Sequence, residues 1–196
     1  ALDCHYWAMN SMHMHIVDDP LNTVDYAKEV QPNLFCSVPR IYEKIFSNLT
    51  AAINQKAVLK YGLKLPGISY LLKKKLKTAV GFGNLTFAIS GAAPINPEIL
   101  DLFQKLDIPL FEGYGMTENT AAATLNYTNH NKIGSVGPPI DETEIKISEN
   151  GEVLIKGNHV MRGYYKNDEA TKETIIDNWL HTGDVGKIDS EGYLYI

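Results

Sequence analysis

The chain has 196 residues, of which 44% are hydrophobic, and its formal net charge is −5. A chain of this length can bury a sizeable core, so it needs neither a disulfide nor a structural metal to fold. The acidic balance disfavours nucleic acid as the main partner, because binding to phosphates requires clustered lysine and arginine.

One short basic run, Lys73-Lys74-Lys75 with Lys77, is typical of a solvated helix face. The two cysteines, Cys4 and Cys36, are expected to be reduced thiols, as in a cytoplasmic protein. No apolar run approaches the roughly 20 residues that cross a bilayer, and no signal peptide is visible. We therefore predict a cytoplasmic protein without a transmembrane segment. Peripheral contact with a membrane and the oligomeric state stay open.

The first two thirds of the chain alternate between helix and strand patterns. Apolar spacing and capping residues predict helices over 21–30, 41–56 and 97–106. Residues 61–77 are amphipathic but broken at Pro66-Gly67, which predicts short helices. Short apolar runs predict buried strands at 34–38, 85–90 and 109–111. This alternation predicts an α/β fold with an open, mostly parallel sheet and flanking helices.

The pattern changes after residue 131. Residues 144–147 and 152–155 flank Glu149-Asn150-Gly151, and an Asn-Gly pair between alternating residues is a strong hairpin signal. A second turn at 189–192 separates strand patterns at 184–188 and 193–196, and 167–176 predicts one helix. We therefore expect an α/β subdomain over 1–131 and a smaller β-rich subdomain over 132–196.

The first candidate site follows the strand at 109–111 and reads Glu112-Gly113-Tyr114-Gly115-Met116-Thr117-Glu118. In open α/β sheets ligands bind beyond the carboxyl ends of the strands, and glycines let a flat ligand approach the backbone. Tyr114 can cover one face of a base, Thr117 offers a hydroxyl to a phosphate, and Glu118 offers a hard oxygen ligand to Mg²⁺. A glycine-rich turn with a threonine cap and a solvated glutamate explains this stretch alone equally well.

Two further stretches could contribute to the same site. Trp179-Leu180-His181-Thr182-Gly183-Asp184 places an aspartate beside a glycine at the start of a predicted strand, where it can accept two ribose hydroxyls. Taken alone, a turn aspartate that caps the hairpin is the simpler interpretation, with His181 as a turn residue. Ser90-Gly91-Ala92-Ala93-Pro94 presents small residues and backbone groups, and alone it is only a strand-to-helix turn.

The order and spacing of these segments over residues 20–196 resemble the adenylate-forming superfamily. This superfamily includes acyl-CoA synthetases, the adenylation domains of peptide synthetases and beetle luciferases. The run Ser37-Val38-Pro39-Arg40-Ile41-Tyr42-Glu43-Lys44-Ile45 is similar to the Val-Pro-Arg helix start of long-chain fatty acyl-CoA synthetases. The insert between this run and Ser90 is similar to theirs as well.

The resemblance implies a role for each candidate residue. Tyr114 would stack on adenine, and Asp184 would hold the ribose hydroxyls. Thr117 would contact the α-phosphate and Glu118 the Mg²⁺, so these two are the catalytic candidates. The base would be lined by Gly91, Ala92, Ala93, Pro94, Glu112 and Gly113, and Ile196 would pack near it. Gly91 and the backbone of Gly115 and Met116 would border the acyl pocket, whereas 151–165 would be mainly structural.

The resemblance also implies an activity. The parent enzyme would use ATP and Mg²⁺ to adenylate a fatty acid, which we expect to be a long-chain one, and would transfer the acyl group to coenzyme A. The family's phosphate loop upstream and its C-terminal domain have no counterpart here. We therefore expect a piece of a longer ligase with little or no activity alone. Three alternatives remain: a ligase for another carboxylic acid, a non-catalytic module that binds a nucleotide or acyl-adenylate, and a structural or interaction domain.

Overall fold

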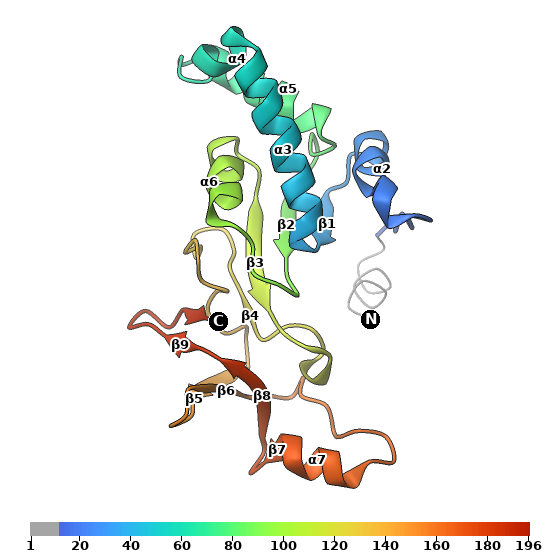
Figure 1. Cartoon of the computed structure of the whole chain (residues 1–196), viewed down its shortest axis with the longest axis vertical. Coiled ribbons are helices and arrows are strands. Elements are labelled where there is room, and N and C mark those ends of the chain that lie inside the picture. Colours follow the sequence, from blue (N-terminus) through green and yellow to red (C-terminus); the bar gives the residue numbers. More distant parts are fainter. Residues whose placement is uncertain (1–11) are drawn as a thin grey trace. The chain divides into compact units, whose positions relative to one another are not determined.

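The computed structural model describes residues 12–196, which form two compact units (Figure 1). One unit comprises residues 13–111, and residues 112–196 belong to the other. The boundary between the units falls inside a strand, β3 (Leu110–Tyr114), whereas the sequence pattern changes twenty residues later. Cys4, expected to be a reduced thiol, lies outside the described residues. No helix within 12–196 is long and apolar enough to span a membrane.

The unit of residues 13–111 is built on parallel strands. β1 (Leu34–Ser37) and β2 (Phe87–Ser90) pair in parallel, from Leu34 opposite Phe87 to Ser37 opposite Ser90. The strand order continues through β2 to β3, where the Ala88 N–H donates to the Pro109 carbonyl at 2.8 Å. The predicted α/β fold with a mostly parallel sheet is confirmed. The prediction that the first strand is buried is wrong, because β1 is an edge strand of the described sheet and Cys36 is exposed.

Helices accompany these strands in the predicted order (Figure 1). They are a 3-10 turn, η1 (Pro20–Asn22), and the α-helices α2 (Thr23–Val30), α3 (Pro39–Gln55), α4 (Ala57–Gly62), α5 (Ile68–Ala79) and α6 (Pro97–Lys105). The Asp19 side chain caps η1 by accepting the Leu21 N–H at 2.9 Å, and Asn96 caps α6 in the same way through Glu98. The break at Pro66-Gly67 separates α4 from α5, as predicted.

An aromatic cluster forms the core between this sheet and its helices. Tyr42 on α3 is fully buried, and its ring lies edge-on to Phe35 and Phe103 at centroid distances of 5.8 and 6.2 Å. The Tyr42 hydroxyl donates to the carbonyls of Phe35 at 3.0 Å and Ile89 at 2.9 Å. One buried hydroxyl therefore joins α3 to both parallel strands, and burial raises its pKa well above the ordinary value.

The unit of residues 112–196 contains an antiparallel sheet in the order β5-β6-β8-β7. Its strands are β5 (Glu144–Ile147), β6 (Glu152–Lys156), β8 (Trp179–Val185) and β7 (Ile175–Ile176). The helix α7 (Asp168–Thr174) precedes β7 and is capped by Asn167, whose side chain accepts the Ala170 N–H at 3.2 Å. A second hairpin joins β9 (Lys187–Ile188) to β10 (Leu194–Tyr195). Both predicted hairpins and the predicted helix are present.

The core of this unit consists of five residues without solvent exposure: Ala123, Val153, Ile155, Leu180 and Leu194. Tyr114 and Met116 pack against this core although both belong to the first candidate site. The end of β3 is therefore attached to the antiparallel sheet by apolar contact, which places the candidate loop beside β6 and β8.

We expect Tyr42→Phe to lower the free energy of unfolding of the full-length protein by about 1–2 kcal/mol, because the carbonyls of Phe35 and Ile89 lose the donor that they share. Urea denaturation monitored by circular dichroism would measure this change. Tyr70→Phe is the matched control, since Tyr70 is 68% exposed. Equal stability of the two variants would contradict the role given to the Tyr42 hydroxyl.

Candidate functional site

The first candidate stretch begins inside a strand rather than after one. β3 extends to Tyr114, with Gly113 opposite Leu125 and Tyr114 opposite Thr124 of the antiparallel strand β4 (Thr124–Leu125). The prediction that Gly113 and Tyr114 lie in a loop past the strand is therefore wrong. Its cause is the returning chain at β4, which supplies a hydrogen-bonding partner that the local residues do not reveal.

The loop between β3 and β4 is compact and internally bonded. Within it the 3-10 turn η2 (Thr117–Asn119) carries the two predicted catalytic residues. Asn119 has no solvent exposure, and its Oδ1 accepts the Met116 N–H at 2.8 Å, while the Met116 carbonyl accepts the Ala121 N–H at 2.9 Å. A Cβ on Gly115 would lie 2.4 Å from the Ala121 carbonyl oxygen. Glycine is therefore required at 115 by the close approach of the two backbone segments.

Asp184 lies at an irregularity in β8. Leu154 of β6 pairs with His181, so a regular antiparallel ladder would place Glu152 opposite Gly183, but Glu152 pairs with Val185. A bulge of this kind bends a strand and changes the direction of its side chains. The prediction that Asp184 starts a strand is wrong, since it lies near the end of β8. His181, expected in a turn, also lies within that strand.

The bulge is held in place by hydrogen bonds to β6. Thr182 Oγ1 donates to the Val153 carbonyl at 2.8 Å and accepts the Asp184 N–H at 3.1 Å. The Glu152 carboxylate accepts the Gly183 N–H at 2.9 Å and lies 3.0 Å from His181 Nδ1. The Gly183 N–H and, to a smaller extent, His181 lower the pKa of Glu152. Gly183 itself adopts a left-handed φ of 75°.

The two distant stretches meet at one contact. The Tyr114 hydroxyl donates to Asp184 Oδ2 at 2.6 Å, and both side chains are half-buried. Burial, together with donation to this carboxylate, raises the pKa of Tyr114, so the phenol keeps its proton. The structure therefore brings the Tyr114 phenol and the Asp184 carboxylate together near the ends of β3 and β8.

Glu118 is held by a segment that the sequence suggested only as structural. Its Oε1 accepts the Tyr164 hydroxyl at 2.9 Å, and its backbone carbonyl accepts the Met161 N–H at 2.7 Å. Donation to Glu118 raises the pKa of the Tyr164 hydroxyl. Thr117, the neighbouring candidate, is exposed to solvent.

The remaining predicted site residues have varied surroundings. Glu112 is buried at 8% exposure, whereas Ile196 is 49% exposed, and its Cδ1 would lie 3.3 Å from a Cβ on Gly186. Gly91, Ala92, Ala93 and Pro94 follow β2 in the other unit, where Ala92 adopts a φ of 67°. Their place beside Tyr114 stays a prediction.

Sequence analysis missed three residues that shape the site: Asn119, Glu152 and Tyr164. Each forms a hydrogen bond with a residue of a candidate stretch: Met116, Gly183 and Glu118, respectively. Asn119 lies three residues from its partner Met116 and could have been suspected as a loop cap. Tyr164 lies 46 residues from Glu118 and carries no local signal.

The donor set fits a magnesium ion that is bound mainly by a substrate. Within residues 12–196 no group of three or more acidic, histidine or cysteine side chains could hold a metal alone. Mg²⁺ commonly binds one or two protein carboxylates together with substrate phosphates and water. Glu118 offers one such carboxylate, and the neighbouring Thr117 is exposed to solvent. A nucleotide fits the pair Tyr114 and Asp184, which offers a ring and an acceptor for hydroxyls.

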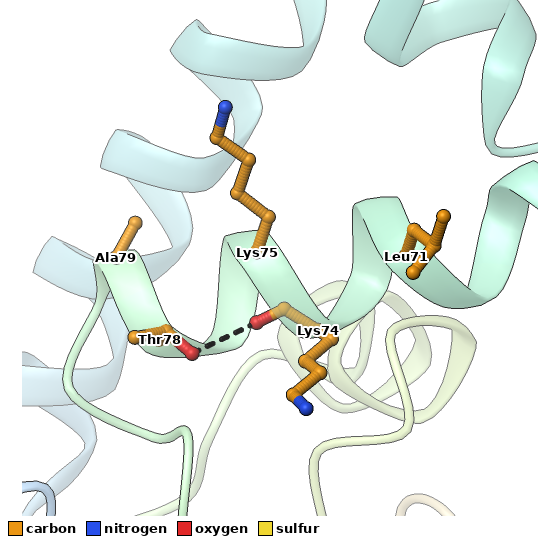
Figure 2. Close-up of a pocket in the computed structure, with 5 residues that line it drawn as sticks. All are labelled: Leu71, Lys74, Lys75, Thr78 and Ala79. Carbon is orange, nitrogen blue, oxygen red and sulfur yellow. Dashed lines mark hydrogen bonds between the residues drawn. The ribbon is translucent and has the colours of Figure 1, made fainter.

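A shallow hollow elsewhere has a different character. Figure 2 shows its lining on one face of α5, formed by Leu71, Lys74, Lys75, Thr78 and Ala79. The hollow lies in the unit of residues 13–111, and its lining contains no carboxylate or aromatic ring. It therefore lacks the aromatic ring and the carboxylate that Tyr114 and Asp184 bring together at the candidate site.

The chain has an α/β fold with a mostly parallel sheet, followed by an antiparallel sheet. Comparison with known families agrees: residues 1–165 match the family of AMP-binding enzymes, and the chain belongs to this family.

Relatives with curated names are fatty-acid–CoA ligases. The chain is 34% identical over 197 residues to a putative fatty-acid–CoA ligase, fadD11, of Mycobacterium tuberculosis, covering 86% of this chain and 34% of the relative. It is 31% identical over 190 residues to the long-chain-fatty-acid–CoA ligase FadD15 of Mycobacterium bovis, with 85% and 32% covered. The long-chain-fatty-acid–CoA ligase ACSBG2 of Gallus gallus is 32% identical, with 88% and 27% covered. The chain thus spans about a third of these relatives.

Solved structures support the fold alone, because their sequence identities are low. The N-terminal domain of FACL13 from Mycobacterium tuberculosis superposes with a TM-score of 0.64 at 23% identity, covering 91% of this chain and 42% of that one. The o-succinylbenzoate coenzyme A synthetase of Bacillus subtilis, solved with ATP and a magnesium ion, gives 0.62 at 22% identity, with 92% and 34% covered.

Gly115→Ala is expected to destabilise the full-length protein by about 1–3 kcal/mol, because the new Cβ would overlap a backbone carbonyl that cannot move freely. Gly134→Ala is the control: no atom lies within 4 Å of its Cβ position, and its φ of 88° alone disfavours alanine. Thermal and urea unfolding would compare the two. A smaller loss for Gly115→Ala than for Gly134→Ala would contradict the close-approach argument.

Proposed function

We propose that this chain is the adenylate-binding part of an ATP-dependent long-chain fatty acid–CoA ligase. The main support is the contact between Tyr114 and Asp184, which unites the aromatic stretch and the Gly-Asp stretch at one place. The identity of 30–34% to fatty-acid–CoA ligases over most of the chain supports the choice of acid.

The proposed roles follow from the chemistry of each group. The Tyr114 ring stacks on adenine, and the Asp184 carboxylate accepts the ribose hydroxyls. Thr117 donates its hydroxyl to the α-phosphate, and Glu118 contributes one oxygen to Mg²⁺, which neutralises phosphate charge when bound. We further propose that Gly91–Pro94, Glu112 and Gly113 line the base, that Gly91, Gly115 and Met116 border the acyl group, and that Ile196 packs near adenine.

The reaction proceeds in two displacements. An oxygen of the fatty-acid carboxylate attacks the α-phosphorus of ATP, and the bond to pyrophosphate breaks as acyl-AMP forms. The thiolate of coenzyme A then attacks the acyl carbon, and AMP leaves with the electron pair of the acyl–oxygen bond. The protein contributes positioning and electrostatic stabilisation in both steps rather than a covalent intermediate.

Isotope exchange between pyrophosphate and ATP tests this function in the full-length protein. A panel of long-chain, short-chain and aryl acids and amino acids would identify the substrate, and we expect exchange with long-chain fatty acids. Exchange that depends only on another acid class would replace the substrate. No exchange with any acid, but retained ATP binding, would favour a non-catalytic binding module.

Asp184→Ala is expected to weaken ATP binding by roughly 1.5–3 kcal/mol, since the ribose hydroxyls lose a charged acceptor. Calorimetric titration of the full-length protein would measure the affinity, with adenine as a comparison ligand that lacks ribose. Asp177→Ala, an exposed aspartate in the turn before β8, is the control. Equal ATP affinity of the Asp184 variant and the parent protein would reject the ribose role.

We also propose a cytoplasmic location with peripheral contact to an anionic membrane. Between Glu43 and Glu98 the chain has eight lysines and no acidic residue, although its net charge is −5. In the same region α4 and α5 expose large apolar side chains: Val58, Tyr61, Ile68, Tyr70 and Leu71. Lysines beside exposed apolar groups complement a negatively charged lipid surface. Nucleic acid remains disfavoured by the overall acidity.

Flotation of the full-length protein with phosphatidylglycerol vesicles tests this contact. We expect Lys74→Glu with Lys75→Glu to abolish salt-sensitive binding, because each lysine near such a surface contributes about 1 kcal/mol. Lys172→Glu, on the exposed face of α7, is the control and should float as the parent does. Unchanged flotation of the double variant would reject this surface.

A further inference from the structure

Glu118 accepts a hydrogen bond from a residue that no motif assigns to the site. The Tyr164 hydroxyl donates to Glu118 Oε1 at 2.9 Å, and both side chains are half-buried. A carboxylate has two oxygens, so this bond engages one of them and leaves Oε2 for a second partner.

Tyr164 is itself held from the opposite side. Its N–H donates to Thr171 Oγ1 at 2.9 Å, and the same hydroxyl donates to the Asn167 carbonyl at 2.8 Å at the start of α7. A Cβ on Gly163 would lie 2.7 Å from Thr171 Cγ2, so the backbone passes close to the helix. The backbone of Tyr164 is therefore held by α7 through contacts that do not involve Glu118.

The same segment contacts the loop of Glu118 at two further points. The Met161 N–H donates to the Glu118 carbonyl at 2.7 Å, and Thr120 Oγ1 donates to the His159 carbonyl at 2.8 Å. These bonds hold the loop at Glu118, within η2, and at Thr120, directly after it. Within residues 12–196 the Tyr164 hydroxyl is the only hydrogen-bond donor to the Glu118 carboxylate.

We infer that Tyr164 is a positioning residue that orients the Glu118 carboxylate so that Oε2 serves the magnesium ion of the bound nucleotide. This inference rests on the proposed function, which makes Glu118 the metal ligand. Ligands of metal ions are commonly oriented by hydrogen bonds from neighbouring groups, and loss of such a bond typically weakens metal affinity or activity 10- to 100-fold. A neutral phenol orients the carboxylate without neutralising its charge.

The experiment compares nucleotide binding with and without the metal in the full-length protein. Calorimetric titration with ATP is carried out in Mg²⁺ and, separately, in EDTA, for Tyr164→Phe and for Tyr165→Phe. Tyr165 is adjacent and 88% exposed, so it is the matched control. We expect Tyr164→Phe to bind ATP about tenfold more weakly in Mg²⁺ and unchanged in EDTA, while Tyr165→Phe matches the parent in both.

A double-mutant cycle tests whether Tyr164 acts through Glu118. We expect Tyr164→Phe to add no further loss in Mg²⁺ when Glu118→Gln is already present. Additive losses, or an equal loss of affinity in Mg²⁺ and in EDTA, would show a general structural role and overturn the inference. So would an unchanged Tyr164→Phe variant.

These outcomes separate the inference from the proposed function. If the parent binds ATP with a Mg²⁺ dependence that Tyr164→Phe does not alter, the inference fails and the function stands. If Tyr164→Phe shows the expected Mg²⁺-dependent loss of ATP affinity but the parent exchanges no pyrophosphate with any acid, the ligase function fails and the positioning role stands.

Discussion

The hydrogen bond from Tyr114 to Asp184 joins residues 70 positions apart at 2.6 Å and holds two distant stretches of this unit together. The ring of Tyr114 is fixed because it packs on a core without solvent exposure, which includes Leu180 of the same strand as Asp184. The aspartate is presented by a bulge, held by Thr182 and Glu152. The ring and the carboxylate are thus held together by the protein's own contacts, and under the proposed function this would lower the entropic cost of nucleotide binding.

A second carboxylate is held in a similar way. Tyr114 donates to Asp184 and Tyr164 donates to Glu118, so each acid receives a neutral phenol instead of a lysine or arginine. Within residues 12–196 the ion pairs lie elsewhere, for example between Lys132 and Asp189 at 2.6 Å. A cation would compensate the charge of the acid, whereas a phenol orients the acid and preserves its charge. Under the proposed function this charge meets the ribose hydroxyls or Mg²⁺.

Local patterns predicted most of the secondary structure because the signals act over a few residues. The break at Pro66-Gly67 and the hairpin at Asn150-Gly151 both depend on residues nearby in the chain. The wrong predictions concern strand ends that depend on pairing with a strand distant in the sequence. β3 extends through Tyr114 because β4 returns beside it, and β8 continues past Gly183 because β6 pairs with it around a bulge.

The sequence alone determined which chemical groups are available: a tyrosine between glycines, a Thr-Glu pair and a Gly-Asp pair, in an order that resembles adenylate-forming enzymes. Only the tertiary structure decided which of these groups meet, and it added Tyr164, Glu152 and Asn119 as their hydrogen-bonding partners. The reason is physical. Propensity and capping depend on neighbours within one or two turns, whereas a contact such as that between Tyr164 and Glu118 depends on how the strands pair and how the core packs.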